Sequence, residues 1–86
     1  MKFRVELSRR AYKSLKKLPR NIKQEIVEKL IELQITPIPR GALKLGGAED
    51  VYRIRVGKFR ILYKLIEEEN VILIFKIELR RRAYRR

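Results

Sequence analysis

The segment Val51–Tyr63 constrains the fold of this 86-residue chain more than any other part of it. It reads Val-Tyr-Arg-Ile-Arg-Val-Gly-Lys-Phe-Arg-Ile-Leu-Tyr, so that apolar and basic residues alternate on both sides of Gly57-Lys58. Alternation with a period of two is typical of a half-buried strand. Glycine at the first position of a two-residue connection favours a type II′ turn. The segment therefore predicts a β-hairpin in which Arg55 lies opposite Arg60.

The two faces of this predicted hairpin differ in chemistry, because successive side chains of a strand point to opposite faces. One face is apolar and aromatic, with Tyr52, Ile54, Val56, Phe59, Ile61 and Tyr63. The other face carries Arg55 opposite Arg60, with Arg53 diagonal to Arg60. Like charges directly opposite destabilise a sheet, whereas a guanidinium group matches the geometry of phosphate. We therefore expect one face to join the core and the other to bind an anion.

The N-terminal part of the chain predicts a strand followed by two helices. Residues 2–7 alternate between charged and apolar side chains, as in a half-buried strand. Ser8 is a predicted N-cap, and we expect the first helix to end at Pro19. The second helix is predicted to begin near Pro19 or Asn21. Its predicted apolar stripe consists of Ile22, Ile26, Val27, Leu30, Ile31 and Leu33.

The C-terminal half predicts further strands on either side of a polar turn. Residues 36–39 contain two prolines that end the second helix, and residues 40–50 are predicted to form an irregular loop. The hairpin extends to about Ile66, and residues 67–70 form a polar turn. Residues 71–77 are almost continuously apolar, which is typical of a central strand covered on both faces.

Length and composition predict one domain that binds a polyanion. Residues 1–86 suit a single α+β domain, in which an N-terminal strand and a helical hairpin pack on one face of a small, mostly antiparallel, twisted sheet. The 23 Lys and Arg residues against 10 Asp and Glu give a net charge of +13, which favours nucleic acid or an acidic protein as partner. The chain has no cysteine and no histidine, so thiol chemistry and the commonest general acid–base group are excluded. The start is charged and the longest apolar run is short, so we expect a cytoplasmic protein without membrane contact.

The C-terminal tail, residues 80–86, contains five arginines and one tyrosine. It is either a disordered basic arm, or an extension in which the last strand delivers Arg80 beside the hairpin arginines. In the second case Tyr84 follows as a group that stacks on a base or transfers a proton. Aromatic residues among arginines suit unstacked RNA bases.

Three features together resemble the RelE/ParE toxin superfamily, and its RelE branch in particular. They are the N-terminal strand with its helical hairpin, the hairpin Val51–Tyr63 and the tail pattern Arg-Arg-x-x-Tyr. The resemblance implies a small α+β toxin of a type II toxin–antitoxin system. It also implies cleavage of mRNA in the ribosomal A site, with the 2′-hydroxyl of the RNA as nucleophile and without a metal or other cofactor. A RelB-like antitoxin, the ribosome and mRNA are the implied partners.

The resemblance also implies which residues act. By motif position the catalytic residues are Arg53, Arg55, Arg60, Arg80 and Tyr84. The basic residues expected to bind RNA nearby are Lys44, Lys58, Arg81 and Arg82. Relatives often have lysine where this chain has Arg53 and Arg55, and arginine cannot give up its proton. The arginines therefore do not supply the general base, and Glu49, Asp50 and Glu78 are the alternatives for that role.

Two other functions suit the same sequence. A ParE-like inhibitor of DNA gyrase would use the same scaffold, although such chains generally lack the basic cluster. A non-catalytic basic module that binds RNA or the ribosome would bind with a steep dependence on salt and leave mRNA intact. A toxin of this type with impaired activity is a further alternative.

Overall fold

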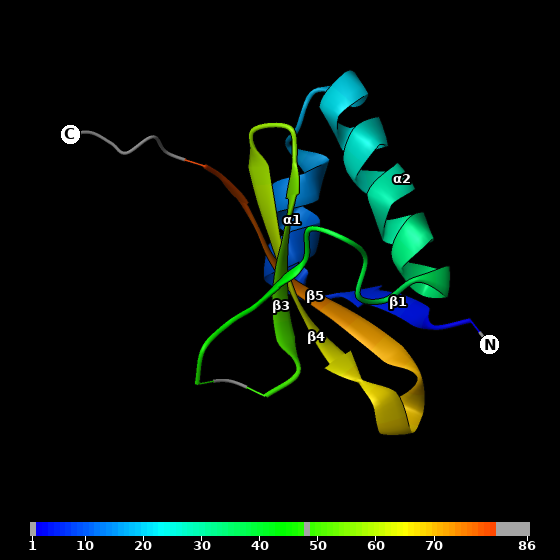
Figure 1. Cartoon of the computed structure of the whole chain (residues 1–86). Coiled ribbons are helices and arrows are strands. Elements are labelled where there is room, and N and C mark those ends of the chain that lie inside the picture. Colours follow the sequence, from blue (N-terminus) through cyan, green and yellow to red (C-terminus); the bar gives the residue numbers. More distant parts are fainter. Residues whose placement is uncertain (1, 48, 81–86) are drawn as a thin grey trace.

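The computed structural model describes residues 2–47 and 49–80 and shows two helices with a five-stranded sheet. Along the chain the elements are β1 (Arg4–Leu7), α1 (Arg9–Lys16), α2 (Arg20–Ile35), β2 (Leu43–Lys44), β3 (Val51–Val56), β4 (Phe59–Ile66), the 3-10 helix η1 (Glu67–Glu69) and β5 (Val71–Leu79). The strand order is β1-β5-β4-β3-β2. Only the pair β1–β5 is parallel among these strands. The predicted α+β fold with a mostly antiparallel sheet is confirmed (Figure 1).

The two helices begin and end near the predicted residues. Ser8 caps α1, because its Oγ accepts a hydrogen bond from the backbone N–H of Ala11 at 3.1 Å. Pro19 is the N-cap of α2, and Thr36 is its C-cap just before the first proline of the 36–39 segment. No helix in the described part of the chain has the length and apolar character that crossing a membrane requires.

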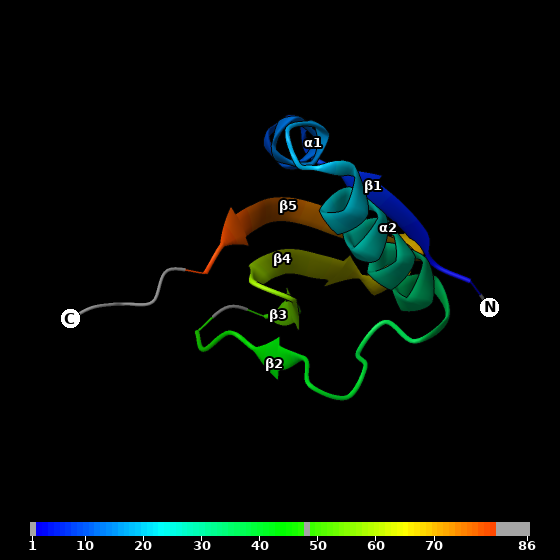
Figure 2. The same cartoon turned by 90° about the horizontal axis from the view of Figure 1, so that it is seen from above.

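The hydrophobic core lies between α2, α1 and one face of the sheet (Figure 2). From α2 it contains Ile26, Leu30 and Leu33, all buried. The strands contribute Ile54, Ile61, Tyr63, Leu65, Ile72, Ile74 and Ile77. α1 packs against β5 and contributes Ala11. Tyr63 is fully buried and donates a hydrogen bond from Oη to the backbone oxygen of Pro37 at 2.8 Å.

The predicted stripe of α2 was partly wrong. Val27 and Ile31 do not join the core, and they are 37% and 55% exposed. At 100° per residue they lie on the outer side of the helix, together with Ile35, which is 71% exposed. α2 is therefore apolar on two sides, and only one of them faces the sheet.

The β3–β4 hairpin has the predicted turn and register. Gly57 has a φ of 59°, and Lys58 does not share this positive φ, so the turn is of type II′ rather than I′. Arg55 pairs with Arg60, and Arg53 pairs with Leu62 on the same face.

The prediction that residues 40–50 form only a loop was wrong. Leu43 and Lys44 form β2, an edge strand that pairs with Arg53 and Tyr52 of β3. A strand of two residues is too short to show alternation, and it depends on β3 for its hydrogen bonds. Asp50, at the end of this segment, has a φ of 58°, which lets the chain turn back into β3.

The last strand, β5, lies between β1 and β4, as expected for an inner strand. Its pairing with β4 shifts between Leu62 and Tyr63, because Lys76 is opposite Leu62 whereas Ile74 is opposite Tyr63. Phe75 is the extra residue of this β-bulge. The bulge decides which side chains of β5 face the core, and it has a direct consequence for the candidate site.

Candidate active site

The face of the sheet that points away from α2 carries two cross-strand rows of polar residues. The first row is Arg55 on β3, Arg60 on β4 and Glu78 on β5. The second row is Arg53, Leu62 and Lys76 on the same three strands. We call the surface formed by Arg53, Arg55, Arg60, Lys76 and Glu78 the basic face. Directly paired side chains lie about 5 Å apart, so these four cations and one carboxylate form a single cluster.

Arg60 lies at the centre of the basic face. Its neighbour on β3 is Arg55 and its neighbour on β5 is Glu78. The Arg60 Nε lies 3.0 Å from Oε2 of Glu78, and both side chains are 31% exposed. Although the pair is close, this Nε is buried without an aligned hydrogen bond among the described residues. The contact is therefore an ion pair between a partly exposed guanidinium group and a partly exposed carboxylate.

Glu78 is held by two cations rather than one. In addition to Arg60, Lys76 places its Nζ 3.4 Å from Oε1 of Glu78. Lys76 was missed by the sequence analysis, because it stands inside an apolar run. The only signal in the sequence is that a single lysine interrupts this run.

The bulge at Phe75 brings Glu78 and Lys76 onto the basic face. In a regular strand, residues 72, 74, 76 and 78 share one face, and Ile72 and Ile74 are in the core. The extra residue inverts the alternation, so that Ile77 joins the core and the charged residues on either side of it face outward. A bulge that re-aims side chains in this way is a frequent feature beside active sites.

The other predicted site residues are placed at the turn or away from the cluster. Lys58 is exposed in the turn, and its backbone oxygen accepts a hydrogen bond of 2.7 Å from the N–H of Arg80. Arg80 is thus held at the turn end of the sheet, the end where Arg55 and Arg60 pair. Lys44 is opposite Tyr52, so the register places it on the side of the sheet opposite the basic face.

Three predicted residues of the tail, Arg81, Arg82 and Tyr84, lie outside the described residues.

Of the three candidate bases, only Glu78 lies in the cluster. Glu49 and Asp50 precede β3, at the end of the hairpin farthest from the turn. Val51 pairs with Lys64 there, whereas Arg55 pairs with Arg60 near the turn. Since a strand rises about 3.3 Å per residue, several residues separate these two acids from Arg60.

Tyr63 is a structural tyrosine on the core side of the sheet. Its burial, reinforced by the neighbouring Tyr52, raises the pKa of Tyr63 from 10.0 to about 12. The rings of Tyr52 and Tyr63 stack with centroids 5.8 Å apart and an interplanar angle of 25°. Tyr63 therefore stays protonated at neutral pH and faces away from the basic face.

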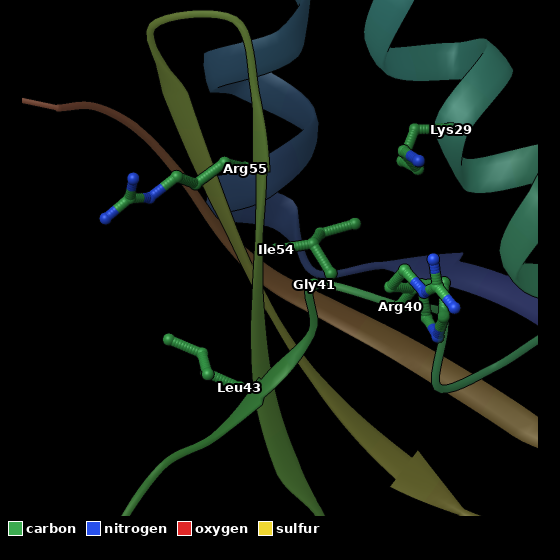
Figure 3. A pocket seen from close by; sticks show the side chains of 7 residues that line it. Lys29, Arg40, Gly41, Leu43, Ile54 and Arg55 are labelled. Carbon is green, nitrogen blue, oxygen red and sulfur yellow. The ribbon is translucent and has the colours of Figure 1, made fainter.

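A separate pocket of about 420 Å³ lies on the other side of β3 (Figure 3). Its lining consists of Lys29, Pro39, Arg40, Gly41, Leu43, Ile54 and Arg55. Figure 3 shows that Arg55, although it lines the pocket, points away from Lys29 and Arg40. Lys29 already forms an ion pair with Glu32 at 3.1 Å. The pocket therefore borders the basic face at Arg55, but none of its other lining residues belongs to that face.

Acidic side chains do not gather into a metal-binding group in residues 2–47 and 49–80. The chemistry available on the basic face is the binding of an anion by guanidinium and ammonium groups, with one carboxylate beside them.

Comparison with known families and proteins gives consistent matches. The family model described as the ParE toxin of the type II toxin–antitoxin system parDE matches residues 5–84. A protein of Methanocaldococcus jannaschii that carries a RelE toxin name is 39% identical over 88 residues, covering 99% of this chain and 98% of that protein. The mRNA interferase toxin RelE of Escherichia coli is 28% identical, covering 96% of this chain and 88% of that protein.

Solved structures show the same fold. The archaeal RelE–RelB complex from Pyrococcus horikoshii matches with a TM-score of 0.86 and 33% identity, over 96% of this chain and 100% of that one. The isolated E. coli RelE toxin matches with a TM-score of 0.85 and 25% identity, over 94% of this chain and 87% of that one.

Proposed function

The chain belongs to the RelE/ParE superfamily of toxins from type II toxin–antitoxin systems, and we propose that it is a ribosome-dependent endoribonuclease that cleaves mRNA in the A site. The basic face carries this proposal, because it joins three arginines on adjacent strands and pairs two of them, Arg55 and Arg60, directly. A relative with this fold is named an mRNA interferase. If this chain cleaves RNA in the same way, its arginines gather where the phosphate of the RNA binds.

The basic face acts on the scissile phosphate. Arg60, flanked by Arg55 and by Arg53 in the next row, contacts the non-bridging oxygens of the phosphate. These oxygens gain charge as the 2′-oxygen attacks phosphorus, and fixed cations stabilise that charge in the transition state. Arg80, held at the turn by its hydrogen bond to Lys58, lies at the edge of the same cluster. From that edge we assign it to the leaving 5′-oxygen.

The ribosome supplies the remaining geometry. In-line attack requires the 2′-oxygen, the phosphorus and the 5′-oxygen to be aligned, and a flexible single strand rarely adopts that arrangement. An mRNA held in the A site is already oriented, and such positioning lowers the barrier by several kcal/mol, on the order of 7–11 in well-oriented systems. The proposed dependence on translating ribosomes implies a cytoplasmic location.

An antitoxin is the expected protein partner. Several of the similar structures are toxin–antitoxin complexes. The outer side of α2 offers such a partner an apolar surface of Val27, Ile31 and Ile35, all exposed. The net charge of +13 favours an acidic chain. We propose that an amphipathic segment of an acidic antitoxin packs on this side of α2.

The surface on α2 can be tested with one substitution. Ile31→Lys is expected to weaken antitoxin binding about tenfold, since a buried interface anchor contributes about 1–2 kcal/mol. Titration calorimetry measures the affinity. Tyr12→Lys, an exposed apolar residue on α1, is the matched control. Equal affinities of the two variants would reject α2 as the docking site.

Cleavage of mRNA distinguishes the proposal from its two rivals. Primer extension on an mRNA in a translation extract should show cuts at ribosome-occupied codons in the presence of the protein and none without ribosomes. Intact mRNA together with gyrase-dependent DNA damage would instead support a ParE-like activity, which the matching family model keeps as a second candidate. Intact mRNA with salt-sensitive ribosome binding would identify a non-catalytic module.

A further inference from the structure

The basic face stabilises negative charge but its arginines cannot accept a proton. A guanidinium group remains protonated in proteins, and the chain contains no histidine or cysteine. Tyr63 is on the core side and its pKa is raised to about 12. Attack by a 2′-hydroxyl nevertheless needs a group that takes its proton.

We propose that Glu78 is the general base of this site, an inference that rests on the proposed ribonuclease function. Its carboxylate takes the proton of the 2′-hydroxyl while the 2′-oxygen forms a bond to phosphorus. The bond from phosphorus to the 5′-oxygen breaks, and its electron pair leaves on that oxygen, which is protonated by solvent. The products are a 2′,3′-cyclic phosphate and a 5′-hydroxyl, so the reaction needs no oxidant, reductant or co-substrate.

The position of Glu78 suits this role. It stands in the same cross-strand row as Arg55 and Arg60, one strand spacing from Arg60. Strands are about 4.8 Å apart, so a phosphate bound by Arg60 and Arg55 brings its neighbouring ribose within reach of the carboxylate. With 31% of its side chain exposed, Glu78 can be approached from the basic face.

The carboxylate is also fixed in place. Arg60 lies 3.0 Å from one carboxylate oxygen and Lys76 lies 3.4 Å from the other. Each contact leaves lone pairs on both oxygens, since a carboxylate can accept about four hydrogen bonds. A base held by two cations keeps its orientation while a hydroxyl binds to a free lone pair.

The bulge at Phe75 is a second, independent observation. If β5 were a regular strand with no bulge, Glu78 would share the face of Ile72 and Ile74 and point into the core. A carboxylate is brought among arginines at this position only because the strand is irregular there. Glu49 and Asp50 lie at the end of the hairpin farthest from the turn, so they are not brought among the arginines.

The competing role for Glu78 is that of a simple counter-ion for the cluster, and the two roles predict opposite results. Removal of a counter-ion makes the basic face more positive, so RNA binds more tightly and cleavage stays as fast or becomes faster. Removal of a base also leaves binding equal or tighter, but cleavage becomes slow.

Glu78→Gln separates the two roles, because glutamine has the same shape without the charge. Purified ribosomes with a defined codon in the A site are mixed with excess protein, and the single-turnover rate of cleavage is measured. Binding is measured on the same complex with a 2′-O-methyl group at the cleavage site. We expect the rate to fall about 10²–10⁴-fold, the usual contribution of a general base, while affinity stays equal or rises.

Two further variants complete the experiment. Glu78→Asp keeps a carboxylate and should recover part of the rate. Glu68→Gln makes the same charge change in the exposed η1 turn and should cleave within about twofold of the unchanged protein. Thermal unfolding of each variant verifies that it is folded.

The outcomes are distinct. Cleavage by Glu78→Gln at the full rate overturns the base assignment and leaves the nuclease function standing. Loss of RNA affinity in parallel with loss of rate assigns Glu78 to the positioning of Arg60 and also overturns it. Absence of cleavage by the unchanged protein on programmed ribosomes rejects the proposed function itself.

Discussion

The two faces of the β3–β4–β5 sheet are made by the same strands but are selected by different forces. On the core face, Ile54, Ile61 and Ile77 form one cross-strand row, and each is at most 5% exposed. On the basic face, Arg55, Arg60 and Glu78 form the adjacent row. Burial of apolar surface is sufficient to explain the first row. The second row gains little from folding, because repulsion between the paired arginines offsets the partly exposed ion pair of Arg60 with Glu78, and we attribute it to a ligand.

The contrast between the core face and the basic face shows that stability and activity depend on different residues of the same strands. Each β-strand alternates between the two tasks from one residue to the next, so neighbouring substitutions should have opposite consequences. Substitutions on the basic face should reduce cleavage without unfolding the protein. Substitutions on the core face should unfold the protein without changing the chemistry of the molecules that remain folded.

Among the substitutions that compare the two faces, the largest expected effect is that of Arg60→Ala on cleavage. Because Arg60 is the central cation of the basic face, we expect a loss of about 10²–10³-fold in rate, as for the removal of one donor that stabilises transition-state charge. The free energy of unfolding should change by less than about 1 kcal/mol, since the side chain is partly exposed and surface ion pairs contribute little. Single-turnover cleavage and urea unfolding measure the two effects.

A second arginine serves as the control for charge. Arg4→Ala removes an exposed arginine that pairs with Glu6 on β1, away from the basic face. It should retain nearly full activity. If Arg4→Ala and Arg60→Ala reduce cleavage equally, the effect belongs to total charge rather than to the basic face.

Ile61→Ala, one residue away on β4, should show the reverse pattern. Ile61 is fully buried, so truncation to alanine is expected to cost about 2–5 kcal/mol in unfolding free energy. Cleavage per folded molecule should be unchanged. Ile61→Val, with an expected cost of about 1 kcal/mol, gives the same comparison should the alanine variant fail to fold. A lower rate in fully folded Ile61→Val would show that the two faces are not independent.

The third expected effect is a loss of stability at alkaline pH through Tyr63. Its pKa is about 12 in the folded protein against 10.0 as the reference, so the folded state favours the neutral phenol. Stability from this group is fully present below pH 10 and is lost as the pH rises toward 12. A difference of two pKa units corresponds to about 2.7 kcal/mol.

Tyr63→Phe isolates this contribution from the other effects of alkaline pH. The variant should lose about 1 kcal/mol at neutral pH, because the hydrogen bond to Pro37 is absent. It should also lose less stability between pH 10 and 12 than the unchanged protein does. Parallel curves of unfolding free energy against pH for both proteins would contradict the role of Tyr63.

The smallest expected effect is that of Lys44→Ala on cleavage. Lys44 is predicted from the sequence to bind RNA, but the pairing with Tyr52 places it on the opposite side of the sheet. We therefore expect a change of less than about threefold, as for a remote screened charge, and a much larger one for Arg55→Ala. Single-turnover rates at two salt concentrations measure both. An equal loss in the two variants would mean that the RNA path extends around the sheet edge.

Local patterns were good predictors wherever neighbouring residues decide the structure. The cap at Ser8, the turn at Gly57-Lys58 and the register of Arg55 with Arg60 were predicted correctly. In each of these, the interacting groups are only a few residues apart, so sequence spacing implies distance in space.

The predictions were wrong where residues distant in the sequence determine the local structure. Val27 and Ile31 continue an apolar pattern on α2, yet the sheet reaches only one side of that helix. Residues 43 and 44 form a strand only because β3 is beside them. Neither fact can be derived from a window along the chain.

The sequence by itself determined the hairpin, the division of its residues into two faces and the concentration of positive charge on one of them. These follow from the alternation of the strands and from a turn whose two residues set the register. The tertiary structure alone decided that Glu78 and Lys76 join the arginines. The face of the sheet on which these two side chains lie depends on the bulge at Phe75. The bulge in turn exists only through the pairing of β5 with β4.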